Sequence, residues 1–325
     1  SSAFFAPIPG CPWRKAASHA LNKVVEMKIV YAFPEASSPD QYAYNNIRST
    51  LLERGHSIVD FDFVSLKERF GTEGMVAELR HLIDRERPDV FWHGIVDDEL
   101  PPGILDELRD RDDLISIVFF SDDDWRIHNH SLHWAGHYNF GSTNDINAPA
   151  VYRQSGFRHL CHVQYAANPL IYHPRTVDRK YDVTFVGQAY LGRPQIVRDL
   201  LSRGIDVRVW GSGWNQFPEL AGICGPPLST EDMITTFCAS RIVLGFAWCS
   251  VPSVAGGVIP QIKGRTFEYP ACGAFQITYE DDRLYNYFDR NREVATFRNA
   301  ADLADKVLYY LRNEKEREEM ARAAH

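Results

Sequence analysis

The chain has 325 residues, of which 45% are hydrophobic and 24% are charged, and its net charge is −8. This length is near the upper size of a single hydrophobic core, so two domains are expected. The negative charge argues against broad nucleic-acid binding, and no apolar run approaches the roughly 20 residues that a membrane helix needs. The six scattered cysteines form no CxxC pair, which favours reduced thiols and a cytoplasmic protein.

Residues 1–26 differ from the rest of the chain because they are rich in proline, glycine and small residues. Their apolar run is too short, and too broken by proline, for a secretory signal. Two interpretations stay open. The segment is either a natural N-terminal arm that packs on the body of the protein or an extension that is not native.

From residue 27 to residue 166, apolar runs typical of buried strands alternate with helical segments. Strands are expected at 28–33, 57–63, 89–95, 114–120, 138–142 and 160–165, and helices at 40–54, 66–87, 103–110 and 149–156. This alternation predicts a parallel sheet with helices on both faces.

The alternation restarts after a probable linker at 167–179, which contains two prolines. Strands are expected at 181–186, 206–210, 241–246 and 274–278, and helices at 193–203, 230–239, 263–272 and 301–324. The sequence therefore predicts an α/β protein of two Rossmann-like lobes, 27–166 and 180–325, that face each other across a cleft. The last helix is long enough to cross back to the N-terminal lobe. Ligands in such sheets bind at the carboxyl ends of strands.

The segment 263–279 carries the strongest functional pattern, because a basic pair and an acid lie on one short helical stretch. If this helix starts near residue 261, its free N–H groups favour a phosphate. Lys263 and Arg265 would then face a diphosphate, and Glu268, one turn further, could accept hydrogen bonds from a ribose diol. This pattern indicates a nucleotide-sugar pocket. The alternative is an amphipathic helix with solvated charges.

The second half of the chain resembles the CgeB/YkvP-type glycosyltransferase-like family, a branch of the GT-B glycosyltransferases. The matching segments are Asp-Val-Thr-Phe-Val-Gly at 182–187, Val-Trp-Gly-Ser-Gly-Trp at 209–214 and Lys-Gly-Arg-Thr-Phe-Glu-Tyr-Pro-Ala-Cys-Gly-Ala-Phe at 263–275, with the closing charged helix at 303–324. The first half matches only in the order of its strands and helices and in an Asp-rich turn.

This resemblance implies that the C-terminal lobe holds the sugar nucleotide, with a UDP-sugar favoured, and that the N-terminal lobe holds the acceptor. It also implies that Glu268 takes the ribose hydroxyls and that the backbone at Gly187 approaches the phosphates. Arg193 could add a cation there. Gly211 and Trp214 would lie near the base, where Trp214 is either a stacking residue or a core aromatic.

One position departs from the pattern of the related retaining enzymes. They carry a second acid eight residues before the ribose glutamate, and here that position is Pro260. The contacts to the sugar and the anomeric outcome therefore stay open.

The N-terminal half contributes an acidic cluster directly after the strand 114–120. Asp122, Asp123 and Asp124 repel one another, which raises some of their pKa values and suits a general base. Two alternatives remain, namely a metal-binding Asp-x-Asp pair and a helix cap. His93, at the end of the third expected strand, is a second candidate base unless it is a plain turn histidine.

These observations predict a metal-independent glycosyltransferase that needs no cofactor and moves a sugar from a nucleotide sugar to an unidentified hydroxyl. The acceptor could be a glycan, a small molecule or a protein. One alternative is a non-catalytic protein that binds nucleotide sugars. Another is a metal-dependent, GT-A-like transferase that uses Asp122 and Asp124.

Overall fold

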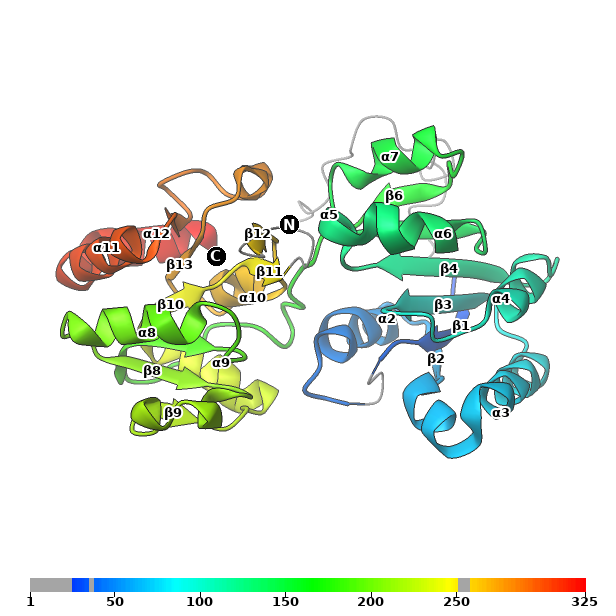
Figure 1. The fold of residues 1–325 in the computed structure, drawn as a ribbon, viewed down its shortest axis with the longest axis horizontal. Coiled ribbons are helices and arrows are strands. Elements are labelled where there is room, and N and C mark those ends of the chain that lie inside the picture. The colour runs from blue at the N-terminus through cyan, green and yellow to red at the C-terminus, as the bar shows by residue number, and fades with distance from the viewer. Residues whose placement is uncertain (1–24, 35–37, 251–257) are drawn as a thin grey trace. The chain divides into compact units, whose positions relative to one another are not determined.

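The computed structural model describes residues 25–34, 38–250 and 258–325, so nearly all of the expected N-terminal arm lies outside it. The described residues form two compact units (Figure 1). The first unit holds the residues up to 38 and residues 47–164, and the second holds residues 39–46 and 165–325. Within these ranges, no helix combines the length and apolarity needed to cross a membrane.

The first unit is built on a sheet of six parallel strands in the order β2-β1-β3-β4-β5-β6. The strands are β1 (Lys28–Ala32), β2 (Ser57–Asp60), β3 (Val90–Ile95), β4 (Ile115–Phe120), β5 (Phe140–Thr143) and β6 (Leu160–His162). The helices are α2 (Ser49–Glu53), α3 (Phe63–Glu86), α4 (Pro102–Arg109), α5 (Asp123–Arg126), η2 (Ile127–Ser131), α6 (Leu132–Ala135) and α7 (Ala148–Gln154).

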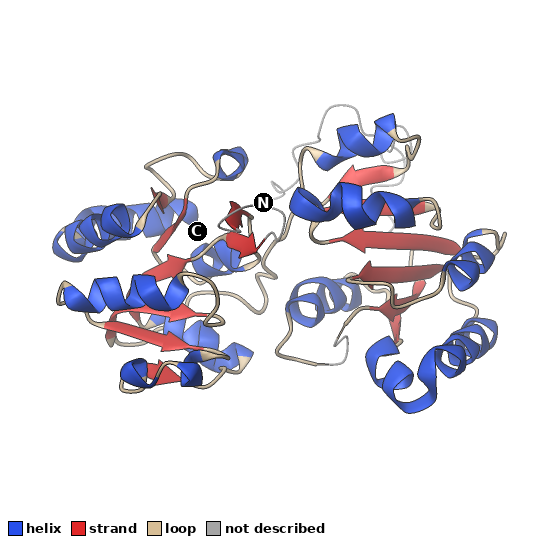
Figure 2. Cartoon of the chain, viewed as in Figure 1, coloured by secondary structure: helices blue, strands red, loops and turns tan. Residues whose placement is uncertain are grey.

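The second unit repeats this plan with six parallel strands in the order β14-β13-β10-β7-β8-β9. Figure 2 shows strands in red and helices in blue in both units. The strands are β7 (Tyr181–Val186), β8 (Val207–Trp210), β9 (Cys224–Gly225), β10 (Ser240–Gly245), β13 (Gln276–Tyr279) and β14 (Ala295–Phe297). The helices are α8 (Arg193–Ser202), η3 (Trp214–Gln216), η4 (Pro218–Leu220), α9 (Thr230–Cys238), α10 (Arg265–Ala271), η5 (Asp282–Asn286), α11 (Ala300–Arg312) and α12 (Glu314–Ala324). A small antiparallel pair, β11 (Trp248–Ser250) and β12 (Val258–Pro260), is separate from the main sheet.

Both faces of the second sheet are covered, because successive side chains of a strand point to opposite faces. In β10, Ile242 and Leu244 pack with α8 and α11, whereas Val243 packs with α9 and α10. This two-sided burial explains why the strands read as continuous apolar runs. The α/β architecture expected from the alternation, two parallel sheets with their helices, is confirmed.

Each sheet has one point at which its strand order reverses direction. In the first unit the chain runs outward from β1 to β2 on one side and from β3 to β6 on the other. In the second unit the same reversal lies between β7 and β10. Ligands of open α/β sheets bind in the crevice outside the carboxyl ends of the strands at such a point.

Three predicted helices differ from the structure. The helix expected at 40–54 is a six-residue π-helix, η1 (Ala43–Arg48), followed by the short α2. The closing helix is interrupted at Asn313, whose non-helical backbone (φ −107°, ψ 67°) separates α11 from α12, and both helices pack within the second unit. The helix expected at 263–272 begins only at Arg265.

Candidate functional site

A small cavity of about 130 Å³ lies at the point of reversal of the second sheet, beyond the ends of β7 and β10. We call it the basic pocket. Three cationic side chains line it, together with residues of the two strand ends and of α10. Its lining comprises Phe185, Val186, Gly187, Arg193, Gly245, Phe246, Ala247, Lys263, Arg265, Thr266 and Tyr269. The structure therefore brings together four of the residues predicted to bind a nucleotide: Gly187, Arg193, Lys263 and Arg265.

Two glycines shape the turn beside this pocket. The Gly187 N–H donates to the Trp210 carbonyl at 2.8 Å, so the turns after β7 and β8 run side by side. A Cβ atom on Gly211 would lie 2.2 Å from the Gly187 carbonyl oxygen, and Gly211 has a φ of 144°. Only glycine fits both conditions. Gly211 supports the turn from behind and does not line the basic pocket.

Arg193 is 94% buried and braces the pocket wall through backbone carbonyls. Its guanidinium donates to the carbonyl oxygens of Gln188 (3.0 Å) and Phe246 (2.9 Å), and it lies 3.9 Å from the ring centroid of Tyr190. Burial lowers the pKa of Arg193 to about 10. Among the described residues, no carboxylate forms an ion pair with it. A buried cation without a nearby anion is costly, and a bound anion would offset that cost.

Arg265 and Lys263 flank the start of α10. Because α10 has seven residues and starts at Arg265, Lys263 precedes the helix and does not belong to it. Arg265 forms an ion pair with Glu268, three residues later on the same face of the helix. The side chain of Arg265 is 37% exposed. It therefore contacts both the buried Glu268 carboxylate and the basic pocket.

Glu268 is fully buried, with 0% of its surface exposed. Besides the pair with Arg265, its Oε1 accepts a hydrogen bond from the Asn46 side-chain amide at 3.2 Å. Asn46 in turn accepts from the Asn168 backbone N–H at 2.7 Å. The Tyr172 side chain also hydrogen-bonds Glu268. The carboxylate predicted to bind a ribose is thus held by Arg265, Tyr172 and Asn46, and Asn46 comes from a distant part of the sequence.

Residues 39–46 form part of the wall around Glu268. The Tyr42 ring lies on Gly264, where an added Cβ would approach to 2.5 Å, and the Tyr42 hydroxyl donates to the Ala166 carbonyl at 2.7 Å. The Asn45 side-chain amide donates to the Thr230 hydroxyl at 2.9 Å. Sequence reasoning assigned this stretch to the N-terminal lobe and missed its contribution, because nothing local to it signals a contact more than 200 residues away.

Trp214 is not available for stacking, since only 2% of it is exposed. Its indole N–H donates to the Gly187 carbonyl at 2.9 Å, and its ring packs edge-on against Phe185. The core-aromatic alternative therefore describes Trp214 in this structure. Its role is to fix the carbonyl of the glycine turn.

Of the three acids after β4, only Asp123 is buried. It accepts a hydrogen bond from the Tyr152 hydroxyl, whose oxygen lies 3.1 and 2.9 Å from the two carboxylate oxygens. Burial raises the pKa of Asp123 to about 6, opposed by its hydrogen bonds. Asp122 precedes α5 without a side-chain capping bond, so the helix-cap alternative does not hold for it. Over the described ranges, no group of three or more His, Cys, Asp or Glu side chains is arranged to hold a metal.

His93 is also buried completely, so it does not face solvent as a base at a strand end would. Its Nδ1 lies 2.6 Å from the Tyr138 hydroxyl, and its Nε2 lies 4.0 Å from a carboxylate oxygen of Glu99. Burial lowers the pKa of His93 to about 3, so the ring is neutral at neutral pH. The sequence pattern had not singled out Glu99.

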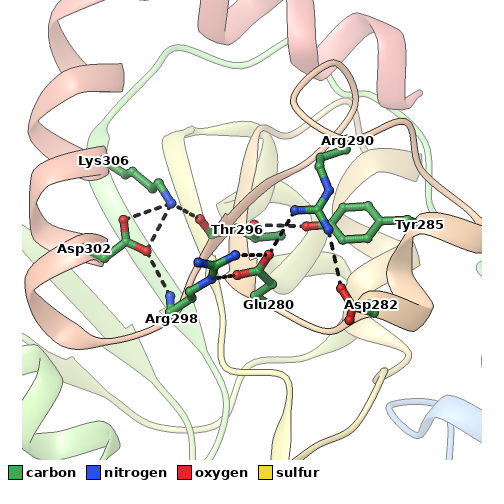
Figure 3. Close-up of polar contacts among 8 residues, drawn as sticks. All are labelled: Glu280, Asp282, Tyr285, Arg290, Thr296, Arg298, Asp302 and Lys306. Atoms are coloured by element: carbon green, nitrogen blue, oxygen red, sulfur yellow. Dashed lines mark hydrogen bonds and ion pairs between the residues drawn. The ribbon is translucent and has the colours of Figure 1, made fainter.

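A second polar cavity, of about 510 Å³, lies beyond the ends of β13 and β14. Figure 3 shows the charged network beside it, in which Glu280 pairs with both Arg290 and Arg298, and Lys306 pairs with Asp302. The Lys306 ammonium also donates to the Thr296 carbonyl at 2.6 Å. These cations already have acidic partners, so the network ties the loop after β13 to β14 and α11.

The comparisons with known proteins agree with this geometry. Residues 193–325 match the model of a family described as glycosyl transferase-like. This part of the chain is therefore similar to a glycosyl transferase-like domain. The matched part contains α8, which begins at Arg193, and the whole segment with Lys263, Arg265 and Glu268. No curated protein matches the sequence significantly.

Solved structures of glycosyltransferases share the fold over nearly the whole chain. HepE of Anabaena, solved in complex with UDP and glucose, has a TM-score of 0.61 at 12% identity and covers 92% of this chain and 94% of its own. A glycosyltransferase from Rickettsia africae gives 0.63 at 11% identity, with 93% of both chains covered. Sucrose-phosphate synthase of Thermosynechococcus elongatus gives 0.64 at 9%, with 91% and 93% covered. The chain therefore has the fold of these solved glycosyltransferases.

Proposed function

We propose that this transferase moves a sugar from a UDP-sugar to a hydroxyl acceptor without a metal, and that it belongs to the CgeB/YkvP-type branch. The donor assignment rests mainly on the buried guanidinium of Arg193, which lines a cavity with Lys263 and Arg265. Among the described residues, no carboxylate forms an ion pair with this guanidinium. The complex of HepE with UDP supports the choice of nucleotide. The cytoplasmic location remains a prediction.

The reaction is a displacement at the anomeric carbon. The acceptor oxygen forms a bond to that carbon and its hydroxyl proton passes to a base or to water, while the bond from the carbon to the diphosphate oxygen breaks and UDP leaves. Lys263 and Arg265 stabilise the negative charge that develops on the diphosphate, in a site where Arg193 already supplies a positive field. Glu268 is fully buried, is held by Arg265 and Asn46 and does not line the basic pocket, so it accepts hydrogen bonds from the ribose diol only after these side chains move. Because three cations surround the leaving group, no metal ion is needed to neutralise it.

Lys263→Ala tests the donor site. We expect the affinity for UDP to fall about tenfold, since a charge-assisted contact to phosphate is worth about 1.5–3 kcal/mol. The affinity for uridine should change little. Lys315→Ala is the control, because that lysine is 90% exposed on α12. Equal losses for UDP and uridine would contradict the phosphate assignment.

Turnover separates the proposal from the alternative of a non-catalytic binding protein. UDP-glucose, with an acceptor panel, should yield UDP and a glucoside, and the rate should persist in EDTA. Binding of UDP-glucose without transfer to any acceptor would favour the binding protein. Loss of activity in EDTA, restored by Mn²⁺, would instead favour metal-dependent transfer.

A further inference from the structure

A cavity of about 450 Å³ occupies the point of reversal of the first sheet. We call it the β1/β3 pocket. It lies beyond the ends of β1, β2 and β3, where α3 begins. Apart from Pro34, its lining is Phe63, Val64 and Val96 on the apolar side and Lys67, Glu68 and Glu99 on the charged side. This is the position at which open α/β sheets bind their ligands, and the volume suits a compound of one or two rings.

The pocket wall is apolar although it faces solvent. Val64, on the first turn of α3, is 41% exposed, and Val96, directly after β3, is 39% exposed. Phe63, buried beneath them, completes the wall. Two exposed valines from separate elements that line one cavity leave apolar area for a ligand to cover, which would be worth about 25 cal/mol per Å².

Glu99 is the fixed polar group of this pocket. Its Oε1 accepts hydrogen bonds from the backbone N–H groups of Val96 (3.1 Å) and Asp97 (2.7 Å). Within residues 25–34, 38–250 and 258–325, its buried Oε2 has no hydrogen-bond partner, and neither has His93 Nε2, 4.0 Å away. Buried polar atoms without partners are rare outside functional sites. Burial raises the pKa of Glu99, which makes the carboxylate a better hydrogen-bond acceptor.

The loop that carries Glu99 is held in place from one side by the helices after β4. Arg126 donates to the Val96 carbonyl and pairs with Asp97 at 2.9 Å. The Trp134 indole donates to Asp98 at 3.1 Å. The carboxylate is thus positioned before any ligand arrives, which is typical of binding sites.

We propose that the β1/β3 pocket is the acceptor site and that it takes a hydroxyl carried by an aromatic or alicyclic body. The ring lies on Val64 and Val96, and the hydroxyl donates a hydrogen bond to the Glu99 carboxylate. His93 is a positioning residue that supports Glu99 from the core. The role of this pocket as an acceptor site rests on the proposed transferase function, whereas its binding of such a compound does not.

The test uses the full chain and two probes, 2-naphthol and 2-methoxynaphthalene, which differ in the ability to donate a hydrogen bond. Val64→Asn should weaken both probes about fivefold or more, because it places a polar group against the ring. Leu52→Asn, at a leucine that is 44% exposed outside the pocket, should leave both unchanged. Glu99→Gln should weaken 2-naphthol about fivefold and spare 2-methoxynaphthalene, whereas the exposed control Glu78→Gln should affect neither.

Two results would overturn the proposal. The first is equal affinity of the wild type and Val64→Asn for 2-naphthol. The second is a wild-type dimer that dissociates in Val64→Asn, since a second copy of the chain would then cover the valines. UDP binding, measured on the same samples by thermal shift, separates the two claims. If the wild type binds 2-naphthol but not UDP, the donor assignment is wrong and the proposal for the β1/β3 pocket stands. Formation of a naphthyl glucoside from UDP-glucose would support both.

Discussion

The Glu268 side chain, which the sequence motif singled out, is held in place by contacts that the motif does not show. Its carboxylate is fully buried and is held by Arg265 and Asn46, so it is fixed rather than solvated. Glu268→Gln keeps the shape and weakens the acceptor for a ribose diol. We expect the affinity for UDP to fall about tenfold, from about 1–3 kcal/mol of lost hydrogen bonding.

Isothermal titration with UDP measures this effect. Glu319→Gln, at a glutamate that is 55% exposed on α12, serves as the control. If Glu268→Gln binds UDP like the wild type, the ribose assignment is wrong and the carboxylate serves only the packing of α10.

Asp123 gives the first unit a pH-dependent stability. Its pKa rises from the usual 3.8 to about 6, chiefly through burial, so the folded unit holds this proton more tightly than the unfolded chain does. The favourable contribution is complete below pH 4 and is lost as the pH rises through about 6. The full difference is about 3 kcal/mol.

Asp123→Asn removes this titration while keeping an oxygen for Tyr152. The difference in unfolding free energy between variant and wild type should therefore shift in favour of the variant as the pH rises from 4 to 7. Denaturant unfolding, followed by tryptophan fluorescence at both pH values, measures it. A difference that is constant with pH would show that Asp123 is not protonated in this range. The opposite trend of His93, whose depressed pKa costs stability below pH 6.5, cancels in the comparison.

At the scale of elements, the stretch 39–46 is the least expected part of the fold. Asn46→Ala removes the amide that donates to Glu268 and the acceptor of the Asn168 N–H, which should cost about 1–3 kcal/mol locally. Hydrogen exchange of the α10 amides should accelerate, and the affinity for UDP should fall as the carboxylate loses its orientation.

Asn286→Ala is the matched control, since that side chain makes an exposed hydrogen bond to the Arg283 carbonyl in the same unit. Unchanged exchange in α10 after Asn46→Ala would mean that Arg265 and Tyr172 position Glu268 without Asn46.

Elements with strong local signals could be predicted from the sequence, and those set by distant partners could not. The strands β7, β8 and β10 read as apolar runs ended by glycine, and their parallel arrangement was expected from the alternation with helices. The helix expected at 40–54 forms over residues 42–53, but its first half is a π-helix, in a stretch where Tyr42 and Asn45 bond to residues of the other half of the chain. The single closing helix failed at Asn313, where the side-chain amide bonds the Tyr309 carbonyl and competes with the helix.

The candidate site divides in the same way. Lys263, Arg265 and Gly187 could be grouped from the sequence because a phosphate site leaves a local pattern of charge and glycine, and the structure places all three at one cavity. Trp214 and His93 were each left with two interpretations, because the sequence shows that a residue follows a strand but not that its side chain is buried, as both are here. Glu99 and Asn46 carry no motif, and their importance lies only in the partners that folding brings to them.

Across the whole molecule, the two sheets share one plan but differ in the chemistry of their reversal points. The second presents arginine and lysine to a small cavity, and the first presents valines and a carboxylate to a larger one. One architecture thus offers an anion site and an apolar site, which suits a reaction with two different substrates. The sequence motif at 263–275 contributes residues to the anion site of the second sheet, and no sequence motif pointed to the valines of the first.

The assignment of residues 39–46 to the second unit bears on how the chain can be divided. The polypeptide passes between the units three times, near residues 38, 46 and 164, so neither unit is one continuous stretch. A fragment that starts at residue 165 would lack Tyr42 over Gly264 and would leave Glu268 without Asn46. A chimaera that exchanges C-terminal halves between related transferases inherits the same mismatch, because eight residues encoded early in the sequence must fit a helix encoded late. Exchange of the C-terminal half therefore requires that residues 39–46 are exchanged as well.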